Sequence, residues 1–167
     1  MVVLQVKGFF LDQDKMPVAV LSDESGHRLL PVWTGPSEAS AIIVELQAIR
    51  PPQPQAHDLL AGLFQRHGFR MERLEIRDCE DGEGCSASIV YRRGLRRYRL
   101  PARASDGLAL AVRLGAPILA SDQLLARAGL SSLLPLLSGT SSSVLFLSTS
   151  EAGRACARAP AAGVPFN

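Results

Sequence analysis

The residues best suited to acid–base or metal chemistry stand at the starts of expected helices. Glu38 and Asp106 each follow a serine and open an apolar helical run, and His57 and Asp58 open a third helix between them. Carboxylates can hold Mg²⁺ or Mn²⁺ or accept a proton, and an imidazole can deliver a proton to a leaving group. These four side chains are therefore the candidate catalytic residues, and Mg²⁺ or Mn²⁺ is the candidate cofactor.

Each acid also has a plainer explanation. A carboxylate in the first turn of a helix commonly satisfies free N–H groups and meets the positive end of the helix dipole, so Glu38 and Asp106 could be caps alone. His57 with Asp58 is more distinctive, because capping does not require a histidine. The spacing of the four residues matches no established metal-site pattern, such as two histidines at i and i+4, so the identity of any metal stays open.

Arginines supply the candidate contacts to phosphate. Arg50 follows the first expected helix and Arg103 precedes the expected helix Ser105–Leu114. A guanidinium can bind phosphate through two parallel hydrogen bonds. The segment Tyr91–Leu100 has the composition of a β-hairpin that carries five further arginines: Arg92, Arg93, Arg96, Arg97 and Arg99. Such a hairpin could contact nucleic acid, or it could be a solvated edge that charge protects from aggregation. Strand alternation places Arg97 and Arg99 on one face and Tyr98 with Leu100 on the other.

The elements that must position these residues come in two similar units. The segments Leu29–Leu46 and Arg99–Leu114 share a Leu-Pro, a short gap, a serine followed by an acid, and an apolar helical run. Upstream of each lies the same order of strand, turn, strand, turn and strand. We therefore predict duplicated β-β-β-α units over residues 1–48 and 70–116, with Glu38 and Asp106 in matching places.

Apolar periodicity and turn residues give the expected bounds of each element. Strands are expected at Val2–Leu11, Met16–Leu21, Arg28–Trp33, Met71–Cys79, Cys85–Tyr91, Arg96–Leu100 and Val144–Ser148, and helices from Pro36 to about Leu46 and at His57–His67, Ser105–Leu114, Asp122–Ala128 and Ser131–Leu137. The predicted fold class is α+β, a mixed sheet packed with helices. It forms one domain over residues 1–130, followed by a helical C-terminal extension over residues 131–167.

Composition and charge set outer limits on function. The net charge of +2 indicates no particular partner, although the stretch from Arg66 to Arg103 is locally basic. Three cysteines without a signal-peptide pattern fit a reducing compartment, and no run of about 18 uninterrupted apolar residues could span a membrane. We expect a cytoplasmic protein, and the apolar VLFLS segment favours a homodimer or higher homo-oligomer.

Three segments together resemble the bifunctional nuclease domain family. They are LPVWTGPSEASAI, RPPQPQAHDLL and ARASDGLALAVRLGAPI, and their order and spacing agree with the family over about Val2 to Gly129. The resemblance implies a domain that cuts both DNA and RNA, has an α+β fold and self-associates. Three positions depart from the family pattern: Ala56 stands where the family has Thr, Pro101 where it has Asp, and Ala104 where it has Pro. The change at Ala56 predicts a lost helix cap that costs about 1 kcal/mol.

Two functions follow as hypotheses. The first is a nuclease of low sequence specificity that hydrolyses phosphodiester bonds in DNA and RNA. The second is a non-catalytic module with the same fold that binds nucleic acid or protein, in which Glu38 and Asp106 are caps. A small-molecule enzyme has little support, because no phosphate loop, dinucleotide fingerprint or nucleophile elbow is present.

Overall fold

The strands form one mixed sheet with the helices packed against it. The computed structural model describes residues 1–78, 85–128 and 145–146. Its elements in chain order are β1 (Val2–Leu11), β2 (Pro17–Ser22), β3 (Leu29–Trp33), α1 (Pro36–Leu46), α2 (Ala56–Arg66), β4 (Phe69–Asp78), β5 (Cys85–Arg93), β6 (Arg96–Ala102), α3 (Ala104–Leu114), β7 (Ile118–Ala120), α4 (Asp122–Ala128) and β8 (Leu145–Phe146). The sheet order is β3-β2-β1-β7-β4-β5-β6, with β8 paired to β1, which confirms the predicted α+β class.

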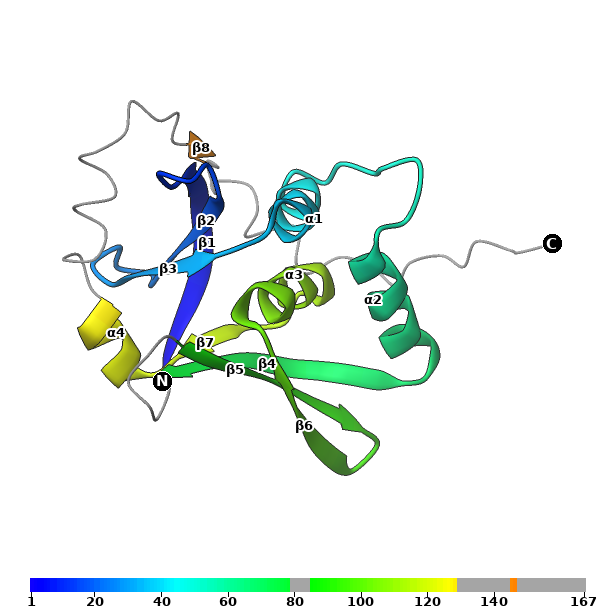
Figure 1. Cartoon of the computed structure of the whole chain (residues 1–167). Helices are drawn as coiled ribbons and strands as arrows, with labels where there is room; N and C mark the ends of the chain where they lie inside the picture. Colours follow the sequence, from blue (N-terminus) through cyan, green and yellow to red (C-terminus); the bar gives the residue numbers. More distant parts are fainter. Residues whose placement is uncertain (79–84, 129–144, 147–167) are drawn as a thin grey trace.

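Each half of the sheet is an antiparallel three-stranded meander followed by a helix. β1, β2 and β3 pair in sequence order and lead into α1, and β4, β5 and β6 do the same and lead into α3. This order of elements is the predicted one, and the common origin of the two units stays a prediction. In Figure 1, α3 lies directly over the β4–β5–β6 half, with α1 and α2 beside it.

The seam between the two halves is β7, a strand that sequence analysis missed. Its three residues pair antiparallel with Val2–Leu4 of β1 and parallel with Leu74–Ile76 of β4. A run of three residues is too short to show the period-2 alternation that marks a strand. Its partners, which lie far away in the sequence, therefore decide its conformation.

Most predicted bounds agree with the structure to within one or two residues. The bounds of β1 and α4 are the predicted ones, whereas β5 and β6 extend two residues further, to Arg93 and Ala102. At the tip of their hairpin, Arg93 pairs with both Phe69 and Arg96, so the hydrogen-bonded ladder continues through charged positions that show no apolar alternation. β8 falls within the predicted strand Val144–Ser148, whereas the predicted helix Ser131–Leu137 lies outside the described residues, and the division into domains stays a prediction.

The core lies between the sheet and the helices. Ile42 of α1, Leu108 of α3, and Leu74 and Ile76 of β4 have no solvent exposure. Four aromatic rings extend this core toward the edge strand β6: Phe64 contacts Phe69 and Tyr91, and Tyr91 stacks on Tyr98 with ring centroids 5.2 Å apart. None of the helices within the described ranges is both long and apolar enough to cross a membrane.

Gly107 of α3 lies against Leu74 of β4. A Cβ at Gly107 would lie 2.5 Å from a terminal methyl carbon of Leu74. Leu74 is fully buried, so it has little room to move.

Gly107→Ala should therefore destabilise the protein by up to about 2 kcal/mol. Overpacking costs about 1–3 kcal/mol, and the better helix propensity of alanine returns about 1 kcal/mol. The matched control is Gly62→Ala in α2, where a Cβ would have no neighbour within 4 Å, so this variant should be neutral or more stable. Urea unfolding of both variants checks the prediction, which fails if the two variants have equal stability.

Candidate functional site

Three helices each carry a carboxylate at their third residue. Glu38 in α1, Asp58 in α2 and Asp106 in α3 all occupy this position, and each lies in the first turn, where free N–H groups and the helix dipole favour negative charge. Sequence analysis predicted the third position for Glu38, and it placed Asp106 in the first turn of a helix expected to begin at Ser105, one residue after the observed start. The three carboxylates therefore share a helical position, but the residues around them differ.

The Glu38 carboxylate is held by its own helix and lies near Arg103 and His57 of other elements. It accepts hydrogen bonds from its own backbone N–H and from the Ser37 hydroxyl, at 2.9 Å from the latter. The backbone N–H is the largest cause of a pKa below the ordinary 4.5; partial burial opposes it, and Ser37, the charge of Arg103 and that of His57 reinforce it. Glu38 is therefore an ionised carboxylate at neutral pH.

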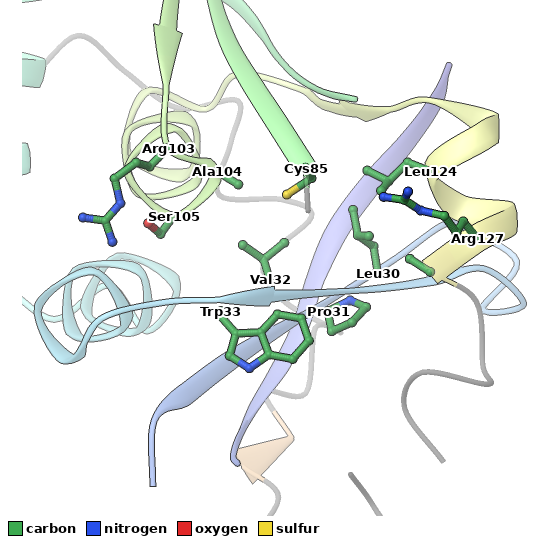
Figure 2. Close-up of a pocket in the computed structure, with 11 residues that line it drawn as sticks. Leu30, Pro31, Val32, Trp33, Cys85, Arg103, Ala104, Ser105, Leu124 and Arg127 are labelled. Carbon is green, nitrogen blue, oxygen red and sulfur yellow. The ribbon is translucent and has the colours of Figure 1, made fainter. Parts of the chain in front are cut away.

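Arg103 joins the start of α3 to the start of α1. It is the N-cap residue of α3, and its guanidinium Nε lies 3.9 Å from a carboxylate oxygen of Asp106. Figure 2 shows the side chain extending from α3 toward the first turn of α1, where Glu38 stands. Its side chain is 74% exposed, so the guanidinium can bind a ligand from solvent. The structure thus brings together four of the predicted site residues: Glu38, His57, Arg103 and Asp106.

A pocket of about 480 Å³ opens beside Arg103. Its walls come from β3, α3, α4 and the first residue of β5. In Figure 2, Leu30 and Val32 point to the side of β3 that faces Ser105 and Leu124, whereas Trp33 points to the other side. The pocket is therefore mostly apolar, with Ser105 and the cationic side chains of Arg103 and Arg127 in its lining, and its volume is in the range of small-molecule sites.

Both carboxylate oxygens of Asp58 make structural contacts, one at the start of its own helix and one with α3. One oxygen accepts the backbone N–H of Gln55 at 2.7 Å, and the other pairs with the guanidinium of Arg113. The helix begins at Ala56 with Gln55 as its cap, so the predicted loss of a cap at Ala56 is wrong. Asp58 itself supplies the capping contact from inside the helix.

Arg113 is a central residue that sequence analysis missed. Its side chain is only 8% exposed; it pairs with Asp58 of α2, lies 3.8 Å from Glu45 of α1, and donates to the Ala41 carbonyl at 3.3 Å. It therefore ties the end of α3 to both other helices. The signal in the sequence is a single charged residue inside the apolar run LALAVRL, a position that must find a buried partner.

A metal-binding role does not fit the side chains that the structure places together. Among residues 1–78, 85–128 and 145–146, no three His, Cys, Asp or Glu side chains gather closely enough to hold a metal ion. We therefore derive no catalytic step through Mg²⁺ or Mn²⁺.

The hairpin arginines divide between the two faces of the sheet, as the predicted alternation requires. Arg93 and Arg96 pair across β5 and β6 on the face that also carries Phe69, and the Arg93 guanidinium lies 5.5 Å from the centre of the Phe69 ring. Arg92, Arg97 and Arg99 lie on the opposite face. Arg50 is exposed between α1 and α2, and it makes no ion pair with any described residue.

Glu75 of β4 is a buried carboxylate that sequence analysis did not single out. Its side chain is 4% exposed and pairs with Arg73 at 2.7 Å, Arg77 at 2.8 Å and Arg99 at 2.9 Å. Burial alone would raise its pKa, but the hydrogen bonds from these three arginines outweigh that effect and lower the pKa to about 2. Three arginines around one buried acid are thus a structural unit of the sheet.

Glu75→Gln should destabilise the protein at neutral pH by about 2 kcal/mol. The pKa falls from 4.5 to about 2 on folding, which corresponds to about 3 kcal/mol, and the exposed ends of the arginines reduce that figure. Because the folded pKa is lowered, the contribution of Glu75 is complete above pH 4.5 and is lost as the pH falls toward 2. Urea unfolding at a series of pH values should show the two proteins converging in acid, and a pH-independent difference would contradict this account.

Comparison with known proteins agrees with the geometry. The geometry is that of an α+β domain with carboxylates and an arginine at neighbouring helix starts. The bifunctional nuclease domain family matches the chain over residues 19–132, and the chain belongs to this family. Two uncharacterized proteins, from two strains of Mycobacterium tuberculosis, are each 37% identical to it over 128 residues, which is 76% of this chain and 76% of each relative.

Proposed function

We propose that this protein is a nuclease that hydrolyses phosphodiester bonds in DNA and RNA with low sequence specificity. The observation that supports it most is the meeting of Glu38, His57, Arg103 and Asp106 at the starts of three helices, in a member of the bifunctional nuclease domain family. Backbone N–H groups at helix starts and an exposed arginine are favourable surroundings for a phosphate.

Each residue has a role in the proposed hydrolysis. Arg103 binds the non-bridging oxygens of the phosphate and balances their charge in the transition state. Water attacks phosphorus, Glu38 accepts the proton of that water, and the bond from phosphorus to the leaving sugar oxygen breaks. His57 gives the leaving oxygen a proton, a task for which imidazole suits neutral pH. Asp106 orients Arg103, and Asp58 positions the start of α2 and with it His57.

The apolar pocket beside Arg103 supports low sequence specificity. A nucleobase next to the bound phosphate would lie against Leu30, Val32 and Leu124, which offer contact area without hydrogen-bonding groups. Bases share flat apolar faces and differ at their polar edges, so such walls accept each of them.

A binding module without catalysis is the second candidate. The pairing of Asp58 with Arg113 favours it, because a carboxylate committed to a structural contact is removed from the set of acids that could do chemistry. The family departures at Pro101 and Ala104, next to the start of α3, favour it as well. In that case nucleic acid would bind at Arg103 and remain intact. A cytoplasmic location and a homodimer remain part of the proposal under either function.

The test is the cleavage of labelled single-stranded RNA and duplex DNA by the purified protein, with Mg²⁺, with Mn²⁺ and with EDTA. Cleavage of both polymers would support the nuclease, and its persistence in EDTA would support catalysis by the side chains alone. Binding without cleavage under all three conditions would overturn the nuclease in favour of the binding module.

A further inference from the structure

One face of the β4–β5–β6 half of the sheet is covered by arginines. Strand pairing places Arg70, Arg92 and Arg97 side by side, and the row next to them contains Arg73 and Arg99. The helices lie on the other face, where Leu74 contacts α3. We call this surface the outer arginine face; its members are Arg70, Arg73, Arg77, Arg92, Arg97 and Arg99.

Two carboxylates hold the arginines in place without neutralising them. Glu75 pairs with Arg73, Arg77 and Arg99, and Glu72 lies 2.6 Å from Arg97 and 3.6 Å from Arg92. Six positive charges and two negative ones leave four positive charges on the face. Like charges at this density repel each other, so the face is favourably placed to attract a polyanion.

The guanidinium groups remain available to a ligand. The side chains of Arg77, Arg97 and Arg99 are 54%, 65% and 49% exposed. Each guanidinium has five N–H donors, and an ion pair with one carboxylate uses at most two of them. Because the glutamates fix the rotamers in advance, less side-chain entropy is lost when a ligand binds.

The arrangement of the arginines is regular along the strands. Arg97 and Arg99 are two residues apart on β6, which corresponds to about 7 Å, a spacing of the same order as that of neighbouring phosphates along an extended nucleic-acid strand. At one end, Arg70, Arg73, Arg92 and Arg97 line a polar pocket of about 580 Å³, which is large enough for a phosphate with its sugar.

We propose that the outer arginine face is a second nucleic-acid site, which binds the phosphate backbone of a single strand without reading its bases. It lies on the side of the sheet opposite the helices and is separate from the site at Glu38, His57 and Arg103. The substrate class rests on the proposed function, but binding at this face requires no cleavage. Planar guanidiniums match phosphate oxygens in pairs, and their repeat along two strands favours a polymer of evenly spaced charge over an acidic protein surface.

The experiment compares two double variants of the same hairpin with the same loss of charge. Arg97→Ala/Arg99→Ala removes two arginines of the outer arginine face, and Arg93→Ala/Arg96→Ala removes two from the opposite face. Binding of a labelled oligouridylate and of the matching oligothymidylate is measured by fluorescence anisotropy over a range of salt concentrations. The outer-face variant should bind both probes at least about tenfold more weakly, and the slope of log K against log salt should fall by about 1.4, the value for two lost phosphate contacts. The other double variant should bind nearly as wild type does.

Equal weakening by the two double variants would overturn the proposal, since net charge alone would then explain binding. Competition by polyglutamate as strong as that by unlabelled oligonucleotide would also overturn it. If Arg97→Ala/Arg99→Ala does not fold, Arg70→Ala takes its place, because Arg70 has no ion pair among the described residues; it should weaken binding several-fold, and no change would overturn the proposal. A labelled dinucleotide separates the two sites. It is too short to span them, so its cleavage reports the proposed nuclease alone and should be unchanged in the outer-face variant.

Discussion

His57→Gln should lower the rate of RNA and DNA cleavage by about 100- to 10,000-fold, the usual contribution of a proton-transferring side chain. The imidazole stands at the second residue of α2, close enough to Glu38 for their charges to interact, and it makes no hydrogen bond with another described side chain. Its removal should therefore leave stability nearly unchanged. Initial rates on labelled RNA, together with an unfolding curve for the variant, check both halves of this expectation.

The matched control is His67→Gln at the other end of the same helix, where His67 is the C-cap residue of α2. It changes the same functional group far from Arg103 and should cleave at the wild-type rate. Equal rates for wild type and His57→Gln would remove His57 from the mechanism. Equal losses in the two histidine variants would point instead to a contaminating activity or to a general change in the protein.

Asp58→Ala should destabilise the fold by about 3 kcal/mol. It leaves Arg113, a side chain only 8% exposed, with the Ala41 carbonyl and a carboxylate oxygen of Glu45 at 3.8 Å as its remaining polar neighbours. Breaking a buried ion pair by removing one partner typically costs about 3–5 kcal/mol, and the capping contact to Gln55 is lost as well. Urea unfolding measures the loss directly.

The double variant Asp58→Ala/Arg113→Met separates a structural role from a catalytic one. Once the buried charge is gone, methionine can fill the same space, so the double variant should be more stable than Asp58→Ala alone. The cleavage rate per folded molecule should fall less in Asp58→Ala than in His57→Gln. A loss of cleavage as large as that of His57→Gln, with stability unchanged, would instead make Asp58 a catalytic residue.

Local signals explain why much of the fold could be predicted from the sequence. Gly35-Pro36 marks the start of α1, Gly115 adopts a left-handed conformation at the end of α3, and the apolar runs between such residues give the strands. These signals act over a few residues, so they placed Glu38 correctly at the third residue of α1. For Asp106 the predicted helix began at Ser105, one residue after the observed start at Ala104.

The surroundings of those residues could not be predicted in the same way. The charge of Arg103 near Glu38, the partners of Arg113 and the arginines around Glu75 all come from elements far apart in the sequence. Short-range sequence patterns do not indicate which helices pack against each other. For the same reason Asp58 was a candidate catalytic residue on sequence grounds, and only the packing of α3 against α2 provided it with a structural partner.

The central position of β7 also has a consequence for how the chain can be divided. β1, the first strand, and β4, the first strand of the second unit, are joined only through a strand that is made after both units are complete. Both three-stranded units therefore precede in the chain the segment that pairs with their inner edges. A gene truncated between the two units should yield fragments that associate with each other or aggregate. A circular permutant that joins the original ends and opens the chain between α1 and α2 should fold. In it, β7 lies between β4 and β1 in the order of the chain, as it does in the sheet.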